Sequence, residues 1–102
     1  MDWIGDLMKD PRKQLLEDAA KLITEDRNET HGDYSLEAER ISDIWSAICA
    51  ETITPSDVPL MMIGLKVARA SAGRMNRDDF VDIAGYAALA WQLALDQGTG
   101  RP

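Results

Sequence analysis

The chain has few cysteines and few basic residues. Cys49 is the only cysteine among its 102 residues, so no disulfide can form within the chain and a reducing compartment is the expected environment. Lysine and arginine number 11 against 18 acidic residues, which gives a net charge of −7. Such a field repels DNA and anionic membrane surfaces. We therefore expect neither as a partner, although a local pair of cations can still bind a small anion.

Long apolar runs and sorting signals are also missing. The most apolar stretch, residues 83–95, is too short to span a bilayer. The N-terminus carries two early acids, Asp2 and Asp6, instead of the basic region of a signal peptide. There is no nucleophile motif, no zinc-type cysteine and histidine spacing and no glycine-rich phosphate loop. These absences favour a cytoplasmic protein and argue against hydrolase triads, zinc sites and Walker-type nucleotidases.

Four stretches with helical spacing of apolar residues predict an all-α, four-helix bundle-like single domain. The expected helices are residues 11–24 with Asp10 as N-cap, 36–50 capped by Ser35 or Asp33, about 55–73, and 77–96 after Asn76. The helical domain then covers residues 10–96. A short apolar hook, 1–9, precedes it and a flexible tail, 97–102, follows it. The hook is expected to pack on the bundle or to contact another copy of the chain.

The apolar residues also predict which faces are buried. The expected core faces are, on the first helix, Leu15, Leu16, Ala19, Leu22 and Ile23, and on the second, Ile41, Ile44, Trp45 and Ile48. The third and fourth helices are apolar nearly all round. Together they have more apolar surface than one small bundle covers, so we expect a homo-oligomer.

A few charges interrupt the two most apolar helices. Lys66 and Arg69 lie on one face of the third helix, and on the fourth helix Asp82 is one turn from Asp78, Asp79 and Tyr86. Buried charges are costly unless paired, so opposed bases and acids are expected. One interpretation is a structural Arg69–Asp82 salt bridge. The other is a ligand site, where Lys66 and Arg69 hold phosphate oxygens and the carboxylates can hold Mg²⁺.

The polar connection before the second helix contains further candidates. His31, the only histidine, is followed by Gly32, Asp33 and Tyr34, and Arg27 lies one turn earlier. A histidine beside a flexible glycine can contact a base or a phosphate, or transfer a proton. The same residues also fit a capping and turn cluster in solvent.

Several ordered motifs resemble a known family of small phage and prophage domains of unassigned function. The resemblance covers about residues 14 to 95 and rests on Arg27-x3-His31-Gly32-Asp33, Ile53-Thr54-Pro55-x-Asp57-Val58, Lys66-x2-Arg69 and Asp78-x3-Asp82-Ile-Ala-Gly-Tyr-Ala. It implies a viral gene that acts in the cytoplasm of a bacterial host.

More distantly, the pattern looks like the MazG-like all-α nucleotide pyrophosphohydrolases, which bind Mg²⁺ and nucleotide phosphates through paired acidic motifs. Asp79-x-x-Asp82 matches the second acidic motif. Lys66-x-x-Arg69 stands where that family places its first acidic motif. Two bases in place of two acids remove metal ligands and supply phosphate ligands, which favours binding without turnover.

Three hypotheses about function follow. In the leading one, an oligomeric phage protein without a cofactor binds a phosphorylated nucleotide through Arg27, His31, Asp33, Tyr34, Lys66, Arg69 and Tyr86. Phage oligomers that sequester immune signal nucleotides are similar to it in size, acidity and helical content. In the enzyme alternative, a Mg²⁺-dependent pyrophosphohydrolase holds metal through Asp78, Asp79 and Asp82, and Glu37 or Glu39 completes the site. The third is a structural or protein-interaction module.

Overall fold

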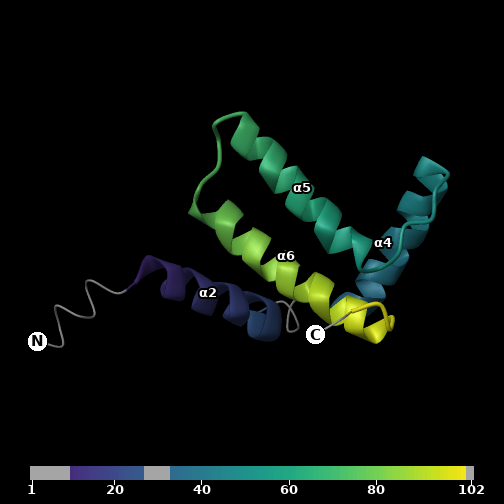
Figure 1. Cartoon of the computed structure of the whole chain (residues 1–102), viewed down its shortest axis with the longest axis horizontal. Helices are drawn as coiled ribbons and strands as arrows, with labels where there is room; N and C mark the ends of the chain where they lie inside the picture. Colours follow the sequence, from purple (N-terminus) through teal and green to yellow (C-terminus); the bar gives the residue numbers. More distant parts are fainter. Residues whose placement is uncertain (1–9, 27–32, 101–102) are drawn as a thin grey trace, which may run out of the picture.

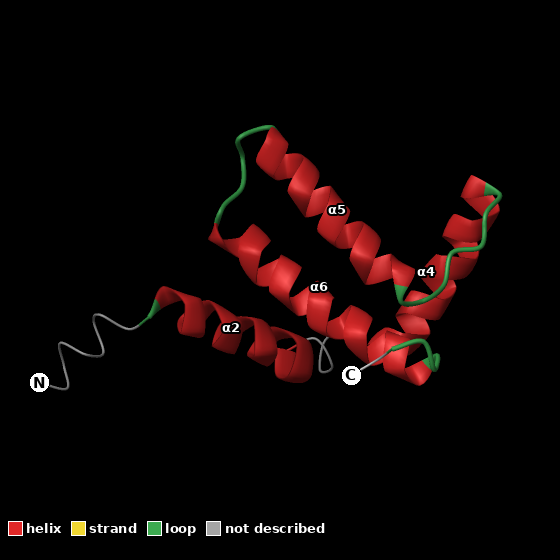
Figure 2. Ribbon diagram, viewed as in Figure 1, coloured by secondary structure: helices red, strands yellow, loops and turns green. Residues whose placement is uncertain are grey.

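The computed structural model describes residues 10–26 and 33–100, and every regular element in these two ranges is helical (Figure 2). The elements are α2 (Pro11–Lys21), the π-helical turn η1 (Leu22–Asp26), α4 (Tyr34–Cys49), α5 (Asp57–Ser71) and α6 (Arg77–Asp96). The all-α prediction is confirmed. The first helix continues as a π-turn, which its sequence did not indicate. The predicted hook, residues 1–9, lies outside the described residues.

Polar side chains fix the starts of three helices. Asp10 accepts a hydrogen bond from the backbone N of Arg12 at 2.9 Å, and Asp33 accepts one from the backbone N of Ser35 at 2.9 Å. Asn76 caps α6 in a reciprocal capping box with Asp79. The predicted caps of the first and fourth helices are therefore confirmed, and Asp33 is the cap of α4.

The helices pack mainly around α6. The antiparallel helices α5 and α6 lie side by side, and α2 packs against another side of α6 (Figure 1). The first half of α4 meets α5 and α6 near the C-terminal end of α6. Tyr34 and Ala38 of α4 form a buried cluster with Leu93 of α6. Gly85 is buried in α6, where an added Cβ would lie 3.1 Å from Ile23 Cγ2. The absence of a side chain at residue 85 thus permits the close approach of η1.

The far half of α4 diverges from α5 and α6 (Figure 1). Ile44 is 58% exposed and Ile48 75% exposed, so the prediction that both face the core is wrong for the isolated chain. Leu16 and Leu22 of the predicted first stripe are exposed as well, whereas Ala19 is buried. A closed four-helix bundle therefore stays a prediction, because α4 contributes only its first half to the core.

Residues 97–100 turn back over the end of α6 (Figure 1). The predicted flexibility of the tail, residues 97–102, stays a prediction. Gln97 Oε1 accepts a hydrogen bond from the backbone N of Ser56 at 2.8 Å, and Gln97 Nε2 donates to Ser56 Oγ at 3.0 Å. The backbone N atoms of Thr99 and Gly100 both donate to the carbonyl of Ala94. This end of the chain is thereby attached to the start of α5. Among the described helices, none has the length and apolar character that crossing a membrane requires.

Candidate functional site

Two bases of α5 and two acids of α6 meet where these helices pack together. Lys66 Nζ lies 3.0 Å from Asp82 Oδ2 and 3.4 Å from Asp79 Oδ1. Arg69 Nε lies 3.4 Å from the same Asp79 oxygen. We call these four residues the charge cluster. The expected pairing is corrected in one respect: Arg69 pairs with Asp79, and Asp82 pairs with Lys66.

Asp79 is the fixed centre of the charge cluster. It is only 2% exposed. Its Oδ2 accepts a hydrogen bond from the backbone N of Asn76 at 3.0 Å, and its own backbone N donates to Asn76 Oδ1 at 3.2 Å. The bond from Asn76, together with the charges of Arg69 and Lys66, lowers the pKa of Asp79 below its ordinary value of 3.8, although burial opposes this. Asp79 is therefore ionised at neutral pH and holds both cations in place.

The other members of the charge cluster are more open to solvent. The side chain of Lys66 is 14% exposed, that of Asp82 32% and that of Arg69 49%. Hydrogen bonding to Asp82 is the largest cause that raises the pKa of Lys66 above its ordinary value of 10.5, against the opposing effect of burial. Lys66 is thus held as a cation, and a ligand can reach the cluster through Arg69 and Asp82.

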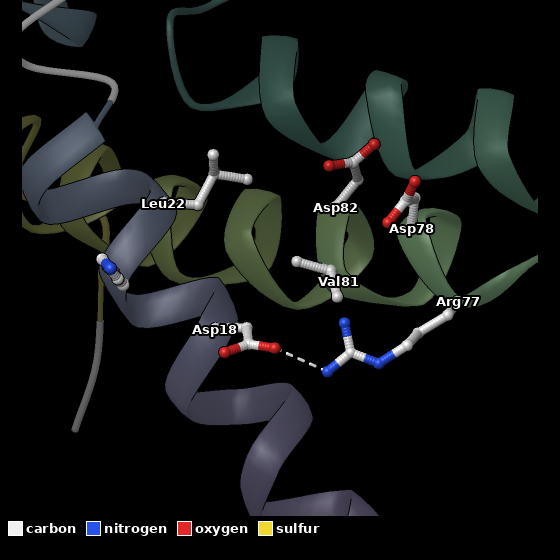
Figure 3. Close-up of a pocket in the computed structure, with 7 residues that line it drawn as sticks. Asp18, Leu22, Arg77, Asp78, Val81 and Asp82 are labelled. Atoms are coloured by element: carbon white, nitrogen blue, oxygen red, sulfur yellow. Dashed lines mark hydrogen bonds and ion pairs between the residues drawn. The ribbon is translucent and has the colours of Figure 1, made fainter.

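A hollow of about 470 Å³ adjoins the charge cluster between α2 and the first turns of α6 (Figure 3). We call it the α2–α6 hollow. Its lining residues are Asp18, Lys21, Leu22, Arg77, Asp78, Val81 and Asp82. Arg77 Nη2 lies 2.6 Å from Asp18 Oδ2. Asp82 borders the hollow and also pairs with Lys66 of α5, so this residue is common to the hollow and the charge cluster. The volume is in the usual range for small-molecule pockets.

The charged lining from α2 was not predicted from the sequence. Asp18 and Lys21 are charged residues of the first helix, and Arg77 is the first residue of the fourth. Only the packing of α2 against α6 brings them to one hollow. The acidic residue 18 and the basic residue 77 are far apart in the chain, and no local spacing connects them.

The aromatic candidates line a cavity that α4, α5 and α6 form together. A cavity of about 80 Å³ is lined by Tyr34, Glu37, Ile41, Trp45, Val58, Met62 and Tyr86. Met62 is four residues from Lys66 on α5, and Tyr86 is four residues from Asp82 on α6. Four residues span about 6 Å along a helix. The structure thus places Tyr86 about one helical turn from Asp82 and brings Tyr34 and Glu37 of α4 to the same cavity as Tyr86.

The remaining candidates are placed elsewhere. Asp33 is exposed and accepts hydrogen bonds as the cap of α4. Glu39 borders a different hollow, beside Pro55 and Gln97. Arg27 and His31 lie outside the described residues.

A metal site would need carboxylates that converge. Within residues 10–26 and 33–100, no group of three or more histidine, cysteine, aspartate or glutamate residues is arranged to hold a metal ion. Asp79 is already bonded to Asn76, Lys66 and Arg69, and Asp82 to Lys66. Asp78 is exposed and borders the α2–α6 hollow instead. Asp78, Asp79 and Asp82 thus have different surroundings in the described part of a single chain, and the Mg²⁺ site of the enzyme alternative stays a prediction.

Comparison with known proteins places this arrangement in a family. Residues 14–94 match the model of a domain of unknown function, DUF6378. The Gene 55 protein of Mycobacterium phage L5 is 36% identical over 89 residues, which are 86% of this chain and 57% of that protein. The Gene 55 protein of Mycobacterium phage D29 is 31% identical over 90 residues, 88% of this chain and 60% of that protein. The chain thus spans less than two thirds of the length of either relative, and no solved structure matches it.

The family match covers both helices of the charge cluster and almost all of α2, the helix that completes the hollow. The two relatives are phage proteins, in agreement with the resemblance to small phage domains that the motifs indicate. On this match the chain belongs to the DUF6378 family.

Proposed function

We propose that the chain binds a phosphorylated nucleotide, with Lys66 and Arg69 in contact with phosphate oxygens. The convergence of both cations on one buried oxygen, Asp79 Oδ1 at 3.4 Å, carries the proposal. Asp79 is itself held by the capping box, so the cations are ordered before a ligand arrives. The Arg69 side chain is 49% exposed, and its planar guanidinium suits phosphate oxygens.

The nucleotide base has a proposed place in the small cavity between α4, α5 and α6. Tyr34, Trp45 and Tyr86 line this cavity, and its Met62 is one helical turn from Lys66. Aromatic side chains can stack on a nucleobase of any kind. We place the base at the Tyr86 end and the phosphates at the charge cluster, and we keep Arg27, His31 and Asp33 as proposed contacts at the edge of the site.

Binding without hydrolysis is the form of the proposal that the charges favour. Lys66 and Arg69 stand where a MazG-like enzyme has acids, and they already engage Asp79 and Asp82. A metal-dependent mechanism needs converging carboxylates with an open coordination position. We therefore propose sequestration of a signal nucleotide in the host cytoplasm, without a cofactor. Pyrophosphohydrolysis with Mg²⁺ at Asp78, Asp79 and Asp82 is the competing activity.

We also propose that copies of the chain associate with one another. Large apolar side chains are exposed on several helices, including Ile44 and Ile48 of α4 and Leu60, Leu65 and Val67 of α5. Exposed apolar side chains that form a contiguous surface are typical of an interaction surface. The diverging far half of α4 and the outer face of α5 are the proposed contact, which would complete the bundle with a second copy.

A melting-temperature screen tests the proposed function. The purified chain is heated with mononucleotides, cyclic dinucleotides and cyclic ADP-ribose compounds, each with and without Mg²⁺, and every compound that shifts the melting point is then recovered and chromatographed. A bound ligand stabilises the native state by mass action. A shift with the compound recovered intact supports sequestration. Cleaved product that depends on Mg²⁺ supports the enzyme, and no shift with any compound supports a structural or protein-binding role.

A further inference from the structure

The cavity of about 80 Å³ near the point where α4 and α5 diverge (Figure 1) is called the aromatic cavity below. Of its lining residues on α4, Ile41 and Trp45 are four positions apart and therefore lie on one face of the helix. Ile48 follows Trp45 by three positions on the same face, but it is 75% exposed. The apolar face of α4 thus continues from the aromatic cavity into solvent.

The lining face of α5 continues in the same way. Val58 and Met62 line the aromatic cavity and are four positions apart. Leu65 follows Met62 by three positions on that face and is 53% exposed. Beyond the aromatic cavity, the two diverging helices therefore have exposed apolar side chains on the faces that line it.

A second copy of the chain is the occupant that this surface fits best. The surface consists of four exposed and three partly exposed side chains, which are Ile44, Ile48, Met61 and Leu65, and Ile41, Trp45 and Met62. These offer on the order of 500 Å² per copy, and a two-fold contact uses the surface of both copies, so the total is close to the roughly 1,000 Å² that a specific interface needs.

The shape of this surface also favours an identical partner. The far half of α4 extends away from the other helices (Figure 1), and its exposed Ile44 and Ile48 are apolar. The same surface thus contains a free apolar helix and, beside it on α5, the exposed Met61 and Leu65 on which such a helix can pack. A two-fold contact between identical copies requires a surface that is complementary to itself in this way.

We infer that a second copy covers this surface and closes the aromatic cavity, so that the base of the nucleotide is enclosed between two copies. This inference rests on the proposed function, and it joins nucleotide binding to the association of copies. The residues that the partner covers follow directly on those that line the cavity, so the partner excludes water from the bound base. Binding and association then strengthen each other by the same factor, because coupling between two binding events is reciprocal.

Ile48→Lys tests the inference, and Leu16→Lys is its matched control. Leu16 is a 60% exposed residue of α2, and neither Leu16 nor Ile48 lines the aromatic cavity. Both variants add one positive charge at an exposed apolar position. Equilibrium titration with the adenosine and guanosine 5′-diphosphates is combined with light scattering on the same samples. We expect Ile48→Lys to be monomeric and to bind about 10-fold more weakly than the wild type, and Leu16→Lys to match the wild type in both measurements.

The wild type provides a second readout, since the diphosphate that binds it should strengthen its association about 10-fold in light scattering over a dilution series. Wild-type affinity in Ile48→Lys would overturn the inference. A loss of affinity in a variant that still associates would overturn it as well, because the missing partner would not be the cause. In both cases the wild type still binds nucleotide and the proposed function stands. Failure of both diphosphates to bind the wild type would instead count against the proposed function itself.

Discussion

Lys66 Nζ lies 3.0 Å from Asp82 Oδ2, and this ion pair joins the middle of α5 to the second turn of α6. Lys66 is largely covered, but the side chain of Asp82 is 32% exposed and borders the α2–α6 hollow. A phosphate that reaches Lys66 therefore competes with Asp82 for it. The same contact fixes the helix pair and forms one edge of the proposed binding site, so ligand binding and stability are expected to be coupled.

The pH dependence of stability should reflect both ends of the charge cluster. The pKa of Asp79 is lowered by the hydrogen bond from Asn76. Its contribution to the free energy of unfolding is therefore present above the pKa of the unfolded state and is lost as the pH falls through the pKa of the folded state. The pKa of Lys66 is raised by Asp82. Its contribution to the free energy of unfolding is therefore complete below the pKa of the unfolded state and is lost as the pH rises through the pKa of the folded state. We expect the unfolding free energy to be level between about pH 5 and pH 9 and to fall on both sides.

Urea unfolding of Lys66→Met across the alkaline range checks this assignment, with Lys13→Met as the exposed control. Lys66→Met should lose less stability than the wild type between neutral and alkaline pH. The control should lose as much as the wild type. Parallel curves for all three proteins would show that Lys66 does not contribute to the alkaline loss.

A pair of glycine substitutions tests how closely α2 and η1 approach α6. In Gly64→Ala the new Cβ meets nothing within 4 Å, whereas in Gly85→Ala it lies 3.1 Å from Ile23 Cγ2. The alanine at 64 should stabilise the chain by about 0.5–1 kcal/mol through helix propensity. The Gly85→Ala variant should be less stable than the Gly64→Ala variant by about 1 kcal/mol or more, because η1 and α6 must move apart. Equal gains in denaturant unfolding would contradict the packing of Ile23 on Gly85.

Much of the fold was predictable because local chemistry decides it. Asp10, Asp33 and Asn76 are cap residues in the sequence and cap residues in the structure. The approach of Lys66 and Arg69 to Asp79 and Asp82 also followed from their spacing, since each pair shares one helix face. The exact pairing did not follow, because helix spacing gives the direction of a side chain but not its depth. The capping box holds Asp79 between α5 and α6, where it pairs with Arg69.

Other features depend on how the helices pack, which local patterns do not specify. Ile44 and Ile48 have the spacing of a core face, but they lie beyond the point where α4 leaves the other helices. Lys21 and Arg77 reach one hollow only because α2 lies against the start of α6. Residues that line a hollow between two helices in this way are found only from the three-dimensional structure.

The proposed association of copies predicts a specific effect of charge on α4. Ile48 is 75% exposed near the end of this helix. In Ile48→Lys a charge would be buried in the contact between copies, which is unfavourable unless it finds a partner. Light scattering should show an oligomer for the wild type and for the control Lys13→Ala, and a smaller species for Ile48→Lys. A monomeric wild type would refute the association.

Nucleotide affinity of Arg69→Ala, compared with wild type and with Arg40→Ala, tests the central claim most directly. Arg40 is an exposed arginine of α4, so it is a control for the loss of one positive charge. Equilibrium titration with the adenosine and guanosine 5′-diphosphates should show binding to the wild type and to Arg40→Ala, and a loss of about 10-fold or more in affinity for Arg69→Ala. Unchanged affinity in Arg69→Ala would show that the phosphates bind elsewhere and would contradict the proposed role of the charge cluster.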